Sequence, residues 1–130
     1  MSGQTDLATL LASLNPSADP TLYVFCTVPG ARYGDLSHIE PVASMAEAEG
    51  LTLVVAKDNA ERAGLPYAGT FHCIHLNVHS SLHAVGLTAA VATTLAEHGI
   101  SANMIAGHYH DHVFVPSDRS KAALELLGAL

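Results

Sequence analysis

The stretch that decides the fold is FHCIHLNVHSSLHAVGLTAAVATTLAEHGISANMIAGHYHDHVFVPSDRSKAALELL, residues 71–127. Its clearest helix is expected at residues 86–98, because a leucine or valine recurs every four residues and Gly99 then supplies a left-handed terminator. Around this helix the pattern predicts a strand at 71–78, strands at 100–106 and 110–115 joined by a tight turn at 107–109, and a last helix that begins at Ser117 or Asp118.

The order strand, helix, strand, strand, helix is most of the split βαβ arrangement called ferredoxin-like, which one more strand would complete. The first half of the chain echoes it, because LTLVVAKDNAERAGL (51–65) parallels HVFVPSDRSKAALEL (112–126). Each segment is a strand that leads through an aspartate into an alanine-rich helix. We therefore predict an α+β fold, a ferredoxin-like βαββαβ sandwich, in which two degenerate copies share an antiparallel sheet.

The first copy is less regular than the second. The pattern predicts a helix at 6–14 capped by Thr5 or Asp6, strands at 21–28 and 51–56, and a helix at 58–63. Residues 41–49 fit either an edge strand or a short helix, and the segment 30–50 takes the place of the long helix. The expected divisions are an N-terminal helix (1–20), a degenerate first unit (21–70) and a second unit (71–130).

The amino-acid composition of the chain argues against some classes of function. The 130 residues include 49% hydrophobic and 13% charged residues, and 12 acidic against 5 basic side chains give a net charge of −7. Such a chain has no cationic surface for a phosphate backbone, which argues against nucleic-acid binding. Its apolar runs are too short for a membrane span, and its first residues lack the basic start of a signal peptide. We expect a soluble cytoplasmic protein without a cofactor.

The two cysteines, Cys26 and Cys73, lie within apolar runs and lack metal-type spacing. Buried, reduced thiols that pack in the core are the simplest interpretation. A catalytic thiol would need a nearby histidine, and on a strand His72 faces away from Cys73.

Several short motifs mark the second half: Val85-Gly86 at the entry of an alanine-rich helix, Gly99-Ile100 at its end, Asn103, and the valine-rich strand Val113–Val115. Together they resemble the ACT domains of amino-acid metabolism, above all the regulatory ACT units of aspartate kinases. The whole chain after Thr21 is also similar to small stand-alone bacterial tandem-ACT proteins. It departs from the kinases in its HYHDH turn, and it contains no kinase catalytic region. The resemblance implies a regulatory, allosteric protein that binds an amino acid where two ACT units meet, and therefore a homodimer.

The helix entry at Gly86 is the candidate ligand site. The preceding loop and the first free N–H groups of the helix form a positive pocket for a carboxylate, and Asn103 offers both a donor and an acceptor. The simpler interpretation is that this glycine and this asparagine only mark the start of a helix and of a strand. The candidate ligand-binding residues are Ser81, Leu82, His83, Ala84, Val85, Gly86, Leu87, Thr88, Asn103 and Ile105.

Histidine is over-represented, with nine residues, and three of them cluster at His108, His110 and His112. On a strand, His110 and His112 share a face about 6 to 7 Å apart and can share a zinc ion, with His108 as a third ligand. His72 or His75 could approach from a neighbouring strand. The alternative is that these side chains only form hydrogen bonds in a hairpin or contact a ligand.

The sequence therefore leaves three hypotheses about function open. The first is a non-enzymatic amino-acid sensor, in which Arg32 could also pair with the ligand carboxylate and His79 and His83 could make binding depend on pH. The second is a metal-dependent enzyme that uses the three clustered histidines, with Asp111 or Glu97 as acid or base. The third is an interaction module without a ligand.

Overall fold

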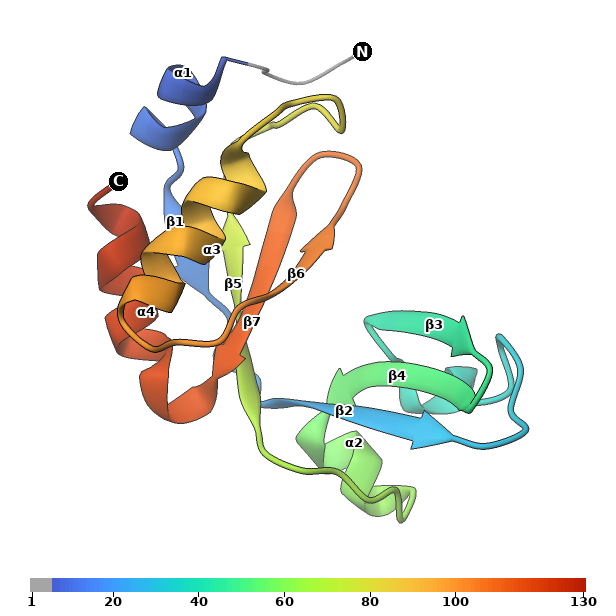
Figure 1. The fold of residues 1–130 in the computed structure, drawn as a ribbon. Coiled ribbons are helices and arrows are strands. Elements are labelled where there is room, and N and C mark those ends of the chain that lie inside the picture. The colour runs from blue at the N-terminus through green and yellow to red at the C-terminus, as the bar shows by residue number, and fades with distance from the viewer. Residues whose placement is uncertain (1–5) are drawn as a thin grey trace. The chain divides into compact units, whose positions relative to one another are not determined.

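The computed structural model describes residues 6–130, which form two compact units (Figure 1). One unit joins the N-terminal segment up to Pro20 with His72–Leu130, and we call it the split unit. The other, Thr21–Phe71, lies between these segments in sequence and is called the inserted unit. No helix in residues 6–130 is long and apolar enough to cross a membrane.

The split unit has ferredoxin-like α+β architecture. Its sheet has the order β1, β5, β7, β6, and β1–β5 and β6–β7 pair antiparallel. Its elements are α1 (Leu7–Ala12), β1 (Pro16–Ala18), β5 (Phe71–Leu76), α3 (Leu87–Glu97), β6 (Asn103–Ala106), β7 (Asp111–Pro116), the 3₁₀ helix η2 (Ser117–Arg119) and α4 (Ser120–Gly128).

The core of the split unit lies between its sheet and the helices α3 and α4, which cover one face (Figure 1). The expected helix is confirmed, because α3 buries the three apolar residues that recur every four positions. Strands β5 and β7 alternate and so turn one set of side chains towards the helices. The buried cluster includes Ile74, Leu76, Leu87, Val91, Leu95, Val113, Val115, Ala123 and Leu127.

The strand that completes this sheet is β1, and the sequence pattern did not predict it. β1 pairs antiparallel with β5, with Ser17 opposite His75. Helix α1 precedes it, and the side chain of Asp6 caps α1 by accepting a hydrogen bond from the Thr9 backbone N–H at 3.1 Å. Thr5, the other expected cap, lies outside the described residues.

The inserted unit is a reduced version of the same arrangement. Strand β4 lies between β2 and β3 and pairs antiparallel with both. The alternatives for residues 41–49 resolve to a strand, and a single 3₁₀ turn replaces the long helix. The elements are β2 (Tyr23–Val28), η1 (Ser37–Ile39), β3 (Ala43–Glu47), β4 (Gly50–Ala56) and α2 (Lys57–Arg62), around a core of Val24, Cys26, Ile39, Leu51, Leu53, Val55 and Ala60.

Candidate functional site

The loop that precedes α3 leads into the N-terminus of this helix, where no side chain caps the backbone N–H groups. The first intrahelical hydrogen bond runs from the Ala90 N–H to the Gly86 carbonyl at 2.9 Å. The N–H groups of Leu87, Thr88 and Ala89 therefore lack a partner within the helix, and they carry the positive end of its dipole. This end of α3 can accept an anionic group such as a carboxylate.

Gly86 is required here by the backbone and by a neighbour. Its φ of +102° is a left-handed conformation that glycine adopts without strain. A Cβ atom at this position would lie 3.0 Å from Cδ2 of Leu7, the first residue of α1. A leucine side chain thus occupies the space beside Gly86, where a ligand could otherwise approach the backbone closely.

The loop itself is anchored at one end and exposed in its middle. The Ser80 N–H donates to the Tyr109 carbonyl at 3.2 Å, and the Ser80 hydroxyl donates to the Asp111 carboxylate at 3.4 Å. The next residues turn back on Ser81, whose side-chain and backbone oxygens accept from the N–H groups of His83 and Ala84, both at 3.0 Å. Beyond this turn the apolar side chains of Leu82 and Val85 are 63% and 84% exposed.

The other two candidate ligand residues lie on β6. The Asn103 side chain donates to the Phe114 carbonyl at 3.3 Å, and Ile105 pairs with His112 on β7. Asn103 begins β6, about 10 Å of strand away from the hairpin at Tyr109 to which the loop is anchored. Within one chain the structure therefore does not bring Asn103 together with the loop.

The three histidines of the HYHDH turn do not gather at one point. The His108 ring packs on Tyr109 with centroids 4.7 Å apart, and the His110 ring packs on His79 at 4.8 Å. Only His112 lies in strand β7, because the chain still turns at His110, whose carbonyl accepts from the Gly107 N–H at 2.8 Å. The expected trio is thus replaced by three separate contacts.

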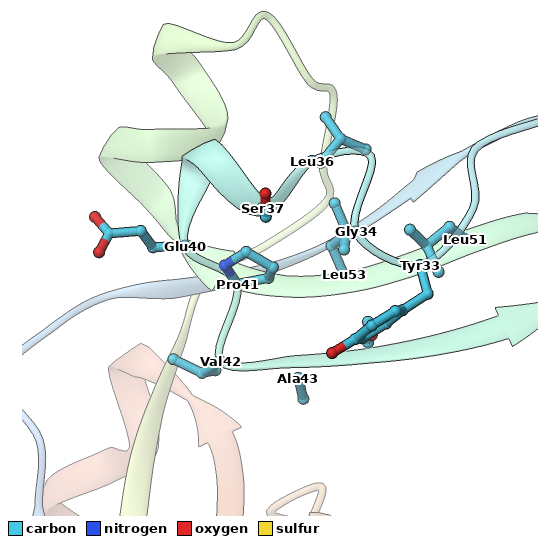
Figure 2. A pocket seen from close by; sticks show the side chains of 11 residues that line it. Tyr33, Gly34, Leu36, Ser37, Glu40, Pro41, Val42, Ala43, Leu51 and Leu53 are labelled. Atoms are coloured by element: carbon cyan, nitrogen blue, oxygen red, sulfur yellow. The ribbon is translucent and has the colours of Figure 1, made fainter.

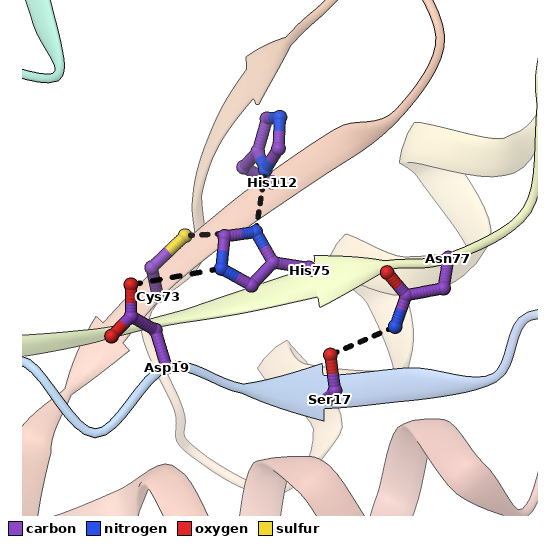
Figure 3. A network of polar contacts seen from close by, with 6 residues as sticks. All are labelled: Ser17, Asp19, Cys73, His75, Asn77 and His112. Atoms are coloured by element: carbon purple, nitrogen blue, oxygen red, sulfur yellow. Dashed lines mark hydrogen bonds and ion pairs between the residues drawn. The ribbon is translucent and has the colours of Figure 1, made fainter.

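His112 instead meets two side chains of β5 (Figure 3). Its Nδ1 lies 2.9 Å from Nδ1 of His75, and the Sγ of Cys73 lies 3.9 Å from the same His75 atom. The other nitrogen of His75, Nε2, lies 3.8 Å from the Asp19 carboxylate. His72 points elsewhere, as expected, with its Nδ1 2.9 Å from the Ser120 hydroxyl.

Burial favours the neutral forms of the Cys73 thiol and the His112 ring. Desolvation raises the pKa of the Cys73 thiol to about 12, and the Asp19 carboxylate adds to the effect. Desolvation also lowers the pKa of His112, helped by the neighbouring His75 and His110 and opposed by Asp111. The thiol and the His112 ring are thus both uncharged near pH 7.

The remaining candidates of the sequence are Arg32, Glu97 and Asp111, of which Asp111 is the neighbour of His112 in β7. The exposed Arg32 donates its backbone N–H to the Asp35 carboxylate at 2.8 Å, and its guanidinium forms no ion pair with any residue in 6–130. Glu97 is the exposed last residue of α3, and Asp111 holds the Ser80 hydroxyl. The structure does not place either acid in the role of a catalytic acid or base.

The inserted unit contains a cavity that the sequence analysis missed (Figure 2). Its volume of about 530 Å³ lies within the range of small-molecule sites. It forms between β4 and the segment that replaces the long helix, so no local motif marks it. The lining residues are Tyr33, Gly34, Leu36, Ser37, Glu40, Pro41, Val42, Ala43, Ser44, Leu51 and Leu53.

Comparison with known proteins gives two matches to models of one family, described as ACT domain, over residues 2–72 and 70–129. Among solved structures, a protein of unknown function from Vibrio cholerae, described as a possible transport protein, is 53% identical. The match covers 95% of this chain and 94% of that one, with a TM-score of 0.86. No curated protein matches the chain.

More distant structures share the fold alone. A protein from Agrobacterium tumefaciens is 16% identical over 84% of this chain and 82% of its own, with a TM-score of 0.69. The ligand-free regulatory subunit of aspartate kinase from Thermus thermophilus is 11% identical over 88% of this chain and 95% of its own, with a TM-score of 0.60. With two successive family matches and a ferredoxin-like fold, this chain belongs to the ACT domain family and carries two ACT domains in tandem.

Proposed function

We propose that this protein is a cytoplasmic, non-catalytic sensor that binds a small amino acid at the entry of α3. Membership of the ACT family supports a regulatory, ligand-binding role. The observation that carries the finer proposal is the uncapped N-terminus of α3, preceded by an exposed loop. The N–H groups of Leu87, Thr88 and Ala89 would bind the carboxylate of the amino acid.

The proposed site is completed by a second copy of the chain. Strand β6 lies at an edge of the split unit, where unpaired backbone groups can bind another strand. If β6 pairs antiparallel with β6 of a second copy, Asn103 of one copy comes near Ala106 of the other. The amide of Asn103 would then lie at the hairpin end of the partner's strand, where the loop is anchored. The exposed Leu82 and Val85 would be covered in the same interface.

Regulation follows from this composite site. An amino acid that contacts both copies binds one dimer geometry better than any other and shifts the population towards it. A partner enzyme that recognises this geometry would respond to the amino-acid concentration. The sensor needs no catalytic group, because the regulatory change is a shift in the geometry of the dimer.

The first test is a thermal-shift screen of the purified protein against the twenty amino acids at millimolar concentration. A ligand at 100 times its dissociation constant stabilises the folded state by about 2.7 kcal/mol, a shift of several degrees at this size. Light scattering on the same samples measures the dimer. If no amino acid shifts the melting temperature, the chain is an interaction module and the sensor proposal is wrong.

A matched pair of variants locates the site. Thr88→Glu places a negative charge in the first turn of α3, where the helix dipole tolerates it but a ligand carboxylate is repelled. Thr93→Glu places the same charge on an exposed position further along α3. We expect the amino-acid shift to disappear in Thr88→Glu and to persist in Thr93→Glu. Equal melting-temperature shifts in both variants would show that the amino acid does not bind at the α3 entry.

A further inference from the structure

We propose that Cys73, His75 and His112 form a binding site for a thiophilic divalent cation of the Zn²⁺ class in the split unit. This site differs from the histidine trio of the HYHDH turn and is independent of the amino-acid site. It joins two residues of β5 to one residue of β7 (Figure 3). Zinc takes thiolate and imidazole donors in proteins, and the cation would displace the proton of the Cys73 thiol, which is released to water.

The donor atoms already converge. One atom from each of the three side chains lies within 4.8 Å of the other two. Donors at zinc bond lengths in a tetrahedron lie about 3.3 to 3.6 Å from one another. The two Nδ1 atoms, now 2.9 Å apart, would have to separate slightly, and the Sγ of Cys73, now 3.9 Å from His75, would have to move closer. The widest separation among the three donor atoms, up to 4.8 Å, would have to close by about 1 Å through side-chain rotation.

The orientation of His75 is the second and independent observation. Its Nδ1 faces Cys73 and His112, while its Nε2 faces the Asp19 carboxylate at 3.8 Å. At this distance the carboxylate makes no hydrogen bond to the ring, but its charge favours a proton on Nε2 and so leaves Nδ1 free to bind a metal. Asp19 is itself held in place, because its backbone N–H donates to the Cys73 carbonyl at 2.9 Å.

The site is sheltered and still open to entry. The Cys73 side chain is buried, whereas the side chains of His75 and Asp19 are 34% and 22% exposed. A cation can therefore enter from the side of His75 and Asp19. Three protein ligands leave a fourth position for water, and the bound cation would link β5 directly to β7. Binding would stabilise the split unit through mass action.

The experiment uses the full chain without an affinity tag, freed of metal by a chelator and titrated with Co²⁺. We expect visible d–d bands of tetrahedral cobalt and a thiolate charge-transfer band in the near ultraviolet, which saturate at one ion per chain. Zn²⁺ should abolish both by displacement and raise the melting temperature. Cys73→Ser should remove the charge-transfer band, and Cys26→Ser, the matched control on the other buried cysteine, should retain it.

Two further variants separate binding from folding. Asp19→Asn keeps the size of the side chain and should weaken Co²⁺ binding about 10-fold to 100-fold, as loss of a carboxylate behind a ligand does. His112→Gln should weaken it further, while His108→Gln leaves it unchanged. Circular dichroism checks that each variant is folded. The site is refuted if the wild-type protein gives no cobalt bands, or if Cys73→Ser and Cys26→Ser give the same spectrum.

Discussion

The two units share a three-stranded arrangement, β5, β7, β6 in the split unit and β2, β4, β3 in the inserted unit, but the inserted unit has no counterpart of α3. In the split unit, α3 follows β5 and fills the face of the sheet with three buried apolar side chains. In the inserted unit, an irregular segment with the short helix η1 follows β2, and a cavity remains beside Leu51 and Leu53. The inserted unit lacks a counterpart of α3, and its helix α2 is only six residues long. In our proposal the amino acid therefore binds at the α3 entry in the split unit.

The largest expected effect comes from breaking the packing of α3. Leu95 is fully buried in the core of the split unit, so Leu95→Ala leaves a cavity and should lower the free energy of unfolding by about 2 to 5 kcal/mol. Leu130→Ala is the matched control, because it removes the same atoms from an exposed position outside the proposed interface and should change stability by less than about 0.5 kcal/mol. Urea denaturation measures both. Equal losses would mean that α3 does not supply the core of its unit.

A glycine substitution gives the next largest effect and compares the two units directly. Gly86 and Gly34 both have left-handed backbones, with φ of +102° and +93°. Alanine at either position should cost roughly 1 to 2 kcal/mol in backbone strain. Gly86→Ala should cost more than Gly34→Ala, because its Cβ would meet Leu7, whereas nothing lies within 4 Å of a Cβ at Gly34.

Denaturation of the two glycine variants in the background of Leu7→Ala completes the comparison. Removing the Leu7 side chain should erase the excess cost at Gly86 and leave the cost at Gly34 unchanged. If the excess persists without Leu7, the contact between α1 and the α3 entry does not explain the glycine.

The elements that sequence predicted well are those whose signal is local. The periodic leucines and valine of α3 and the alternation of β5 depend only on neighbours in the chain, and both elements form as expected. Strand β1 has three residues, Pro16–Ala18, and a mostly exposed pattern, so nothing local distinguishes it from a loop. It forms because β5 offers it a partner, which is a property of the whole fold.

The candidate sites divide in the same way. Alternation on β5 placed Cys73 and His75 on one face, away from His72, and this was predictable. The meeting of His75 with His112 depends on β5 and β7 being neighbours, which follows from the ferredoxin-like order of the strands and not from the spacing of these residues. The expected grouping of His108, His110 and His112 does not form, because β7 begins only at Asp111 and His110 stays in the turn. The ligand-binding role of the α3 entry stays a prediction.

The smallest expected effect is a pH dependence that arises in the split unit. Burial, with His75 and His110, lowers the pKa of His112 in the folded state below its usual 6.5. The unfolded chain therefore binds more protons than the folded chain between these two pKa values, and stability falls as the pH falls through 6.5. The loss levels off below the pKa of the folded state.

Urea denaturation at pH 7.5 and pH 5.5, in the presence of a chelator, measures this contribution. His112→Gln should reduce the loss of stability on acidification, whereas His108→Gln should change it less, since His108 lies exposed against Tyr109 in the turn. An unchanged pH dependence in His112→Gln would show that this ring titrates equally in both states. The protonation of His112 would then contribute nothing to the pH dependence of the stability of the split unit.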